Sequence, residues 1–299
     1  MFHGSIVALV TPMDDRGRID FVALRRLVDF HLQSGTDGIV VAGTTGESTA
    51  LTESEFKQLL SRVVEHVDAQ IPVLAGTGSA STAAAIMHTR LASELGADGA
   101  LVVTPYYNRP MQSGLMAHYN ALADVSTIPL VIYNVPSRTA VDILPATVAE
   151  LAQRDEIVAI KEAVPDMTRI RELVSLCGQS LVVLSGDDPS CLEAVRNGAK
   201  GVVSVAANVV PGLFHDMYEN AQSGNWQLAV EIDDRLRHLY DILALESNPI
   251  PVKWALFRMA LMGKGIRLPL LPLSEKHYEK FEQGLKQMVW PEWTGINRT

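Results

Sequence analysis

The chain has 299 residues, of which 47% are hydrophobic and 20% are charged, and its formal net charge at pH 7 is -9. So much apolar material excludes a disordered chain, and the acidic balance excludes a general nucleic-acid binder, which needs a basic face. Cys177 and Cys191 are the two cysteines, too few for a disulfide framework or a cysteine zinc site. The sequence also shows no signal-peptide pattern and no apolar run long enough to cross a membrane. Together these features predict a cytoplasmic location.

Short apolar runs rich in valine and isoleucine recur along the chain, each of them continuous rather than alternating. Such runs are typical of parallel strands that are buried on both faces. The predicted strands cover residues 5–10, 38–42, 72–75, 100–103, 130–133, 158–160, 181–184 and 201–205.

Segments with helical periodicity separate these runs. The first is Phe21–Gln33, and the second begins after Thr52, where Glu55 three residues on completes a capping-box pattern. Later helices are predicted at residues 83–95, at 115–123, from Pro145, at 170–176, and after Asp188, which is expected to cap a helix that opens with Pro189. The repeated alternation of strand and helix predicts an α/β protein, a (β/α)8 TIM barrel.

The barrel is expected to end near Gly224, followed by a C-terminal helical appendage. The predicted domains are therefore a catalytic barrel of residues 1–224 and a helical domain of residues 225–299. Helices are expected at residues 226–245, 251–262 and 274–289. The tail 290–299 shows no periodicity and is expected to be poorly ordered.

The active site of such a barrel lies at the C-terminal ends of its strands, so polar residues that directly follow an apolar run are candidates. Thr44 and Thr45 stand between two glycines after the second run, which suits a carboxylate and equally fits a tight turn with capping hydroxyls. After the fourth run come Tyr106 and Tyr107, either packing residues or proton carriers. Arg138 follows the fifth run, as a carboxylate clamp or as a surface arginine.

Lys161 is the one lysine in the sequence that ends an apolar run at this face. An amine must be neutral to attack a carbonyl, and burial favours the neutral form, so Lys161 is a candidate nucleophile. The alternative is a lysine that extends from the strand end into water. Asp187 and Asp188 follow the seventh run and could bind a metal, but they more simply cap the next helix. The histidines show no metal-ligand spacing, so we expect no metal site.

Several motifs together resemble the dihydrodipicolinate synthase / N-acetylneuraminate lyase family. They are the Gly43-Thr44-Thr45-Gly46-Glu47 turn with Glu55 beyond it, the segment Tyr133-Asn134-Val135-Pro136, and Lys161-Glu162 placed 28 residues after Tyr133. The likeness begins at Gly4-Ser5-Ile6-Val7 and extends through Asn248-Pro249-Ile250-Pro251-Val252-Lys253 to Arg267-Leu268-Pro269. It implies a lyase of the class I aldolase type that uses no cofactor and joins pyruvate to L-aspartate 4-semialdehyde in diaminopimelate and lysine biosynthesis.

The resemblance also implies the catalytic residues. Lys161 would form the Schiff base with pyruvate, and hydroxyl groups would relay the protons. These hydroxyls belong to Tyr133, Thr44 and Tyr107. The family likeness implies a homotetramer made of two tight dimers, in which Tyr107 reaches into the site of a neighbouring subunit.

By the same resemblance, the substrates are held by a second set of residues. Thr45 and the nearby backbone would bind the pyruvate carboxylate, and Arg138 would bind the carboxylate of the aldehyde. Gly186 and Val203 would supply backbone contacts near the lysine.

The main alternative is a sibling aldolase that makes or cleaves a sialic acid or a 2-keto-3-deoxy sugar acid. Arg138 argues against it, since polyol substrates need hydroxyl partners rather than an arginine. A non-catalytic pyruvate sensor would need no proton relay. A phosphate-handling barrel would need a glycine-rich cradle, which residues 204–208 do not supply.

The chain departs from the family pattern in two loops. Val164-Pro165 stands where Thr-Gly is common, and Ala206 stands where threonine is common. Neither position belongs to the implied catalytic groups.

The resemblance further implies an inhibitory lysine site beside Ser48 and Tyr106 in lysine-sensitive relatives. The positions that carry polar side chains there correspond to Glu53, Phe56, Ala80 and Ala84 in this sequence. A free lysine brings three charged groups that each need a partner, so we expect lysine to inhibit weakly or not at all.

Overall fold

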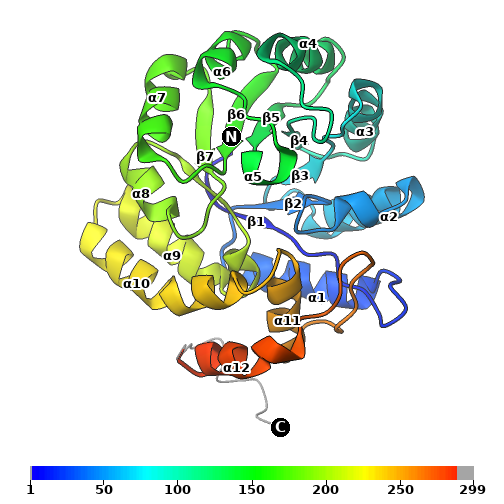
Figure 1. The fold of residues 1–299 in the computed structure, drawn as a ribbon, viewed down its shortest axis with the longest axis vertical. Helices are drawn as coiled ribbons and strands as arrows, with labels where there is room; N and C mark the ends of the chain where they lie inside the picture. Colours follow the sequence, from blue (N-terminus) through cyan, green and yellow to red (C-terminus); the bar gives the residue numbers. More distant parts are fainter. Residues whose placement is uncertain (1, 288–299) are drawn as a thin grey trace.

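The computed structural model describes residues 2–287, whose parallel strands form one closed barrel in chain order (Figure 1). The strands are β1 (Gly4–Ala8), β2 (Gly38–Val41), β3 (Val73–Gly76), β4 (Gly99–Val103), β5 (Leu130–Asn134), β6 (Ile157–Glu162), β7 (Val182–Ser185) and β8 (Gly201–Ser204). β1 pairs with both β2 and β8, which closes the barrel. The predicted (β/α)8 barrel is therefore confirmed.

Helices surround the strands. They are α1 (Phe21–Gln33), α2 (Glu53–Val67), α3 (Thr82–Glu94), α4 (Gln112–Ala123), α5 (Pro136–Thr139), α6 (Pro145–Leu151), α7 (Met167–Cys177), α8 (Cys191–Arg196), α9 (Pro211–Gln222), α10 (Trp226–Leu243), α11 (Ile250–Arg258) and α12 (Tyr278–Gln287). Three short 3-10 turns are η1 (Ser48–Ala50), η2 (Ala206–Asn208) and η3 (Glu275–His277). No helix within residues 2–287 is both long enough and apolar enough to cross a membrane.

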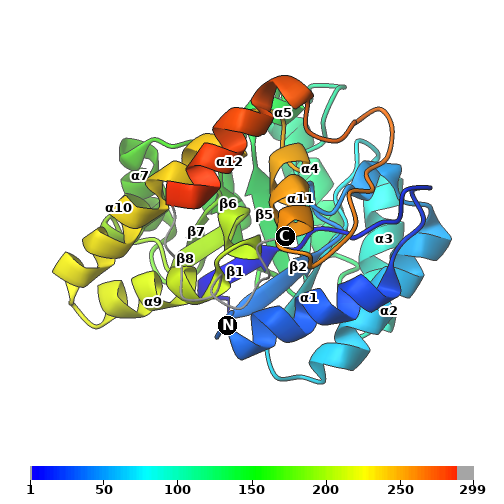
Figure 2. The ribbon, with the colours of Figure 1, turned by 90° about the horizontal axis from the view of Figure 1, so that it is seen from below.

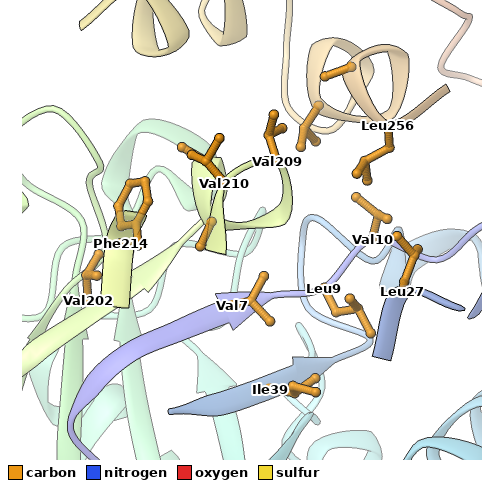
Figure 3. Packing of buried hydrophobic residues seen from close by; sticks show 14 of the residues in the cluster. Val7, Leu9, Val10, Leu27, Ile39, Val202, Val209, Val210, Phe214 and Leu256 are labelled. Carbon is orange, nitrogen blue, oxygen red and sulfur yellow. The ribbon is translucent and has the colours of Figure 1, made fainter. Parts of the chain in front are cut away.

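The strands are buried on both faces, which explains their continuous apolar sequences. Along β1, Ile6 points into the barrel and packs in its interior with Val40. The next residue, Val7, points outward and belongs to the cluster that contains Leu27 of α1 and Phe214 of α9 (Figure 3). The period-2 alternation of a strand thus divides its side chains between two cores.

The start of α2 matches the prediction. The Thr52 side chain accepts from the Glu55 N–H, and the Glu55 carboxylate accepts from the Thr52 N–H at 2.9 Å, which completes the capping box.

The prediction for Asp188 is wrong. α8 begins only at Cys191, with Ser190 as its N-cap residue. The Asp188 carboxylate instead accepts from the backbone N–H groups of Val205 at 3.1 Å and Ala206 at 2.8 Å. Asp188 therefore connects the loop after β7 to the end of β8. Local sequence does not indicate this contact, because it forms only when β7 and β8 lie side by side.

The C-terminal helices pack on the barrel rather than apart from it. α10 contacts α9 and α12, and Figures 1 and 2 show α12 next to both α10 and α11. Trp254 of α11 stacks on Tyr278 of α12 with 4.6 Å between ring centroids. The division at residue 224 remains a prediction.

Two helix boundaries in this region differ from the prediction. α11 ends at Arg258 instead of Met262, because Ala260 adopts a left-handed conformation (φ 58°) and Leu261 N–H donates to the Leu256 carbonyl at 3.0 Å. The helix predicted at residues 274–289 is divided into η3 and α12. Residues 288 and 289 and the tail 290–299 lie outside the described residues.

Candidate active site

A cavity of about 300 Å³ opens where the strands end at their C-terminal side. Six of the predicted site residues line it, and they come from four different strand ends and the loops beyond them. They are Thr44, Thr45, Tyr133, Arg138, Lys161 and Gly186. Tyr107 and Val203 do not line it in this chain.

Lys161 lies near the end of β6 and is only 5% exposed. Its strand register sets it beside Tyr133 of β5, and its Nζ lies 4.3 Å from the centroid of the Tyr133 ring. The lysine therefore does not extend into water, and the alternative of a solvated strand-end lysine is wrong. A buried amine that lies over a tyrosine ring is suited to nucleophilic attack on a carbonyl, and the same tyrosine offers a hydroxyl for proton transfer.

Gly186, which follows β7, leaves room for this lysine. A Cβ atom at residue 186 would lie 2.8 Å from Lys161 Cε and 3.0 Å from its Cγ, closer than side chains pack. Only glycine lets the β7 loop approach the lysine so closely. Val203 belongs to the apolar interior of the barrel, and Val205 is the residue beyond β8 that lines the cavity.

Thr44 and Thr45 lie in a tight turn after β2. Gly46 N–H donates to the Gly43 carbonyl at 3.1 Å, and Ser48 N–H donates to the same oxygen at 3.2 Å. Thr45 is 2% exposed, and its hydroxyl accepts from Asn248 Nδ2 at 3.0 Å. Two hydroxyls on a closely wrapped backbone form a small polar cradle suited to a carboxylate.

Arg138 lies in the short helix α5, which follows β5 and begins with Pro136. Its side chain is exposed and lines the cavity, and its Nη2 donates to the Asn248 carbonyl at 3.2 Å. The guanidinium is thus held at the rim with donors to spare for an anionic substrate.

A buried polar network lies behind the lysine. Glu162 is 1% exposed, accepts from Arg169 Nε at 2.7 Å, and accepts from Asn134 Nδ2 at 3.0 Å. Burial raises the pKa of Glu162, and the positive charge of Arg169 opposes that rise. Glu162 lies at the end of β6 and Asn134 at the end of β5, so their hydrogen bond fixes the strand ends that carry Lys161 and Tyr133.

Asp188 and its neighbour Asp187 line the cavity. The carboxylate oxygen Oδ1 of Asp188 is buried. Burial raises the pKa of Asp188, while hydrogen bonds from Ser204 and Ala206 and the charge of Lys161 lower it. Within residues 2–287 no group of three or more His, Cys, Asp or Glu side chains is arranged to hold a metal ion.

Tyr107 is 92% exposed and has a left-handed backbone (φ 72°). Its neighbour Asn108 anchors the loop by donating to the Ala80 carbonyl at 2.8 Å. An aromatic side chain held out in this way contributes nothing to the cavity of its own chain.

Sequence reasoning missed the contribution of the C-terminal region to this site. Asn248 contacts both Thr45 and Arg138, and Tyr240 of α10 lines the cavity. Asn248 lies 203 residues from Thr45 and 110 residues from Arg138, so no local pattern in the sequence indicates these contacts.

Comparison with known proteins gives one consistent result. The family model described as the dihydrodipicolinate synthetase family matches residues 1–288. A 4-hydroxy-tetrahydrodipicolinate synthase of Nitrosococcus oceani is 51% identical over 287 residues, which cover 96% of this chain and 98% of the relative.

Solved structures agree with the fold. The chloride-inhibited dihydrodipicolinate synthase of Acinetobacter baumannii, solved with pyruvate, is 43% identical with a TM-score of 0.95, and the match covers 96% of this chain and 99% of that chain. The enzyme of Cyanidioschyzon merolae with lysine bound is 36% identical with a TM-score of 0.93, over 96% and 98% of the two chains.

Proposed function

Because the chain belongs to the dihydrodipicolinate synthetase family, we propose that it condenses pyruvate with L-aspartate 4-semialdehyde to give 4-hydroxy-tetrahydrodipicolinate. The observation that carries this function is the buried Lys161 amine, which faces Tyr133 in a cavity rimmed by hydroxyls and an arginine. The chain is a lyase of the class I aldolase type. We also propose that the protein is cytoplasmic, as the sequence predicts.

The first half of the reaction activates pyruvate. The Lys161 amine attacks the keto carbon, and the carbinolamine loses its oxygen as water to leave an imine. The cationic imine makes the methyl group acidic, and removal of one of its protons gives an enamine. Thr44, Tyr133 and Tyr107 carry these protons, and Thr45 holds the pyruvate carboxylate.

The second half forms the carbon–carbon bond and frees the enzyme. The enamine carbon attacks the aldehyde, whose oxygen takes a proton and becomes the 4-hydroxyl group. The amino group of the former semialdehyde then attacks the imine carbon and closes a six-membered ring. The C–N bond to Lys161 breaks, which returns the free amine.

The direct test is a condensation assay on the purified protein with pyruvate and L-aspartate 4-semialdehyde. We expect product only when both substrates are present. A polyol aldehyde in place of the semialdehyde is the control for the sibling aldolases. Turnover with the polyol alone would contradict the proposed substrate.

Arg138 is proposed to bind the carboxylate of the aldehyde substrate. Arg138→Ala should therefore lower kcat/KM for L-aspartate 4-semialdehyde far more than it lowers imine formation with pyruvate. Loss of a charge-assisted contact of about 2 kcal/mol or more corresponds to a fall of at least about 30-fold in kcat/KM for the semialdehyde. Borohydride trapping of pyruvate should stay near the wild-type level. A near-normal kcat/KM for the semialdehyde in Arg138→Ala would show that Arg138 does not bind this substrate. Arg138→Lys tests whether a positive charge is enough without the planar guanidinium group.

Lysine is expected to inhibit this enzyme weakly or not at all. Glu53 is already paired with Lys57 at 2.7 Å, and the buried Phe56 ring lies 5.8 Å from the His88 ring. Ala80 and Ala84 offer no polar side-chain atoms. Few groups therefore remain to replace the water around three charges. Titration of lysine to about 10 mM in the condensation assay checks this, and half-maximal inhibition below about 1 mM, roughly 4 kcal/mol of binding, would show a working site.

The assembly proposed for this chain is a homotetramer of two tight dimers. The support on this chain is Tyr107, whose ring is 92% exposed and does not line the cavity of its own chain.

A further inference from the structure

A buried ion pair joins the turn after β2 to the C-terminal helix α11. Lys253 Nζ donates to Glu47 Oε1, and the two side chains are only 3% and 2% exposed. Their positions in the chain differ by 206 residues. Glu47 ends the turn that carries Thr44 and Thr45, so this contact links the C-terminal helices directly to the pyruvate cradle.

The backbone conformation of this turn must be stabilised by contacts from outside the turn. Ala42 and Glu47, at its two ends, both have left-handed backbone angles, with φ of 54° and 56°. Such angles are unfavourable for residues with a Cβ and persist only where the surroundings enforce them. The second Glu47 carboxylate oxygen accepts from the Arg267 N–H at 3.0 Å, so both oxygens of this acid are used to hold the turn.

The other partner of the ion pair is itself firmly placed. Lys253 lies in α11, whose Leu256 packs in the apolar cluster with Val10 and Val209 (Figure 3). Asn248, just ahead of this helix, donates to the Thr45 hydroxyl at 3.0 Å. α11 and the residues just ahead of it thus contact the turn at two points, through Lys253 and through Asn248.

Stability alone does not explain why charges occupy this place. Burial lowers the pKa of Lys253, and the negative charge of Glu47 opposes that effect. An apolar pair of similar size would commonly be as stable, because two charges lose their hydration when buried. What a charge-assisted hydrogen bond adds is a defined distance and direction.

We propose that Glu47 and Lys253 are positioning residues, which hold the Thr44–Thr45 turn in the geometry that binds the pyruvate carboxylate. This inference rests on the proposed function, since it concerns the pyruvate half of the same site. Neither residue lines the cavity. Their effect passes through the turn that carries Thr44 and Thr45, and in the described part of the chain neither residue forms a hydrogen bond or ion pair with Arg138.

The test uses a double variant, Glu47→Gln with Lys253→Met, which removes both charges and leaves neither unpaired. We expect its KM for pyruvate, and the pyruvate concentration for half-maximal borohydride trapping, to rise at least about tenfold. The KM for the semialdehyde should change less than about threefold, and thermal unfolding should show a folded protein. Glu282→Gln is the matched control, because it breaks the ion pair that Arg258 of the same helix α11 makes with Glu282 of α12 (2.6 Å), and within residues 2–287 Glu282 forms no hydrogen bond or ion pair with Glu47 or Arg267.

Glu47→Asp is the second variant, since it keeps both charges but shortens the side chain. It should raise the pyruvate KM as well, by a smaller factor, even if the double variant does not fold. An unchanged pyruvate KM in either folded variant overturns the inference. An equal rise in both KM values that Glu282→Gln reproduces overturns it too, because it indicates a general loss of packing around α11. If the wild-type protein itself traps no pyruvate, the proposed function fails instead.

Discussion

Lys161→Ala is expected to lose all borohydride trapping of pyruvate and to lower condensation more than about a thousandfold. The reason is that Lys161 forms the covalent bond on which both halves of the reaction depend, and no other described side chain brings an amine to the cavity. Mass spectrometry of digested protein, after incubation with pyruvate and borohydride, locates the adduct. The wild-type protein should carry one reduced pyruvate, on the peptide with Lys161.

A suitable control is Lys200→Ala. Lys200 is exposed and directly precedes β8, at the end of the barrel opposite the cavity. This variant should trap pyruvate as the wild type does. An adduct on any lysine other than Lys161, or none in active protein, would falsify the Schiff-base mechanism proposed here.

Tyr107→Phe is expected to lower condensation by about 100-fold or more, the usual contribution of a positioned proton-transfer group. The substitution removes only the hydroxyl from a ring that is 92% exposed in the single chain, so the fold should not change. Pyruvate binding should survive. Steady-state assays and thermal unfolding of the same preparation separate the two effects.

Hybrid oligomers decide which chain Tyr107 serves. Mixing Tyr107→Phe chains with Lys161→Ala chains should restore part of the activity, because a site with Lys161 from the first chain takes Tyr107 from the second. Each variant alone, at the same total concentration, is the control. Verified hybrids without recovery would show that Tyr107 acts in its own barrel.

The strands were predictable because their signal is local. The run at residues 130–133 is apolar throughout, and the structure has β5 at Leu130–Asn134 with every residue buried. The capping box at Thr52 was equally predictable, since both of its hydrogen bonds join residues that are three positions apart. Lys161 followed from the same rule, because the end of an apolar strand in a barrel lies at the active face.

Predictions that depended on remote contacts fared differently. Asp188 looked like a helix cap, but its carboxylate is taken by backbone N–H groups after β8. Lys253 lies in the helix predicted at residues 251–262, and the helical pattern did not indicate that it is 2% exposed and pairs with Glu47. A hydrophobic pattern reports whether a side chain is buried, and it does not report which distant partner satisfies a buried charge.

The sequence by itself determined the barrel, the order of its strands and the face on which Lys161, Tyr133 and Arg138 stand, because apolar periodicity and strand direction act over a few neighbouring residues. Only the tertiary structure decided that Asn248 and Lys253 complete the site, since closure of the barrel and docking of α11 bring them to Thr45 and Glu47. Contacts between residues about two hundred positions apart leave no periodic trace in one sequence, because each depends on the packing of all the elements between them.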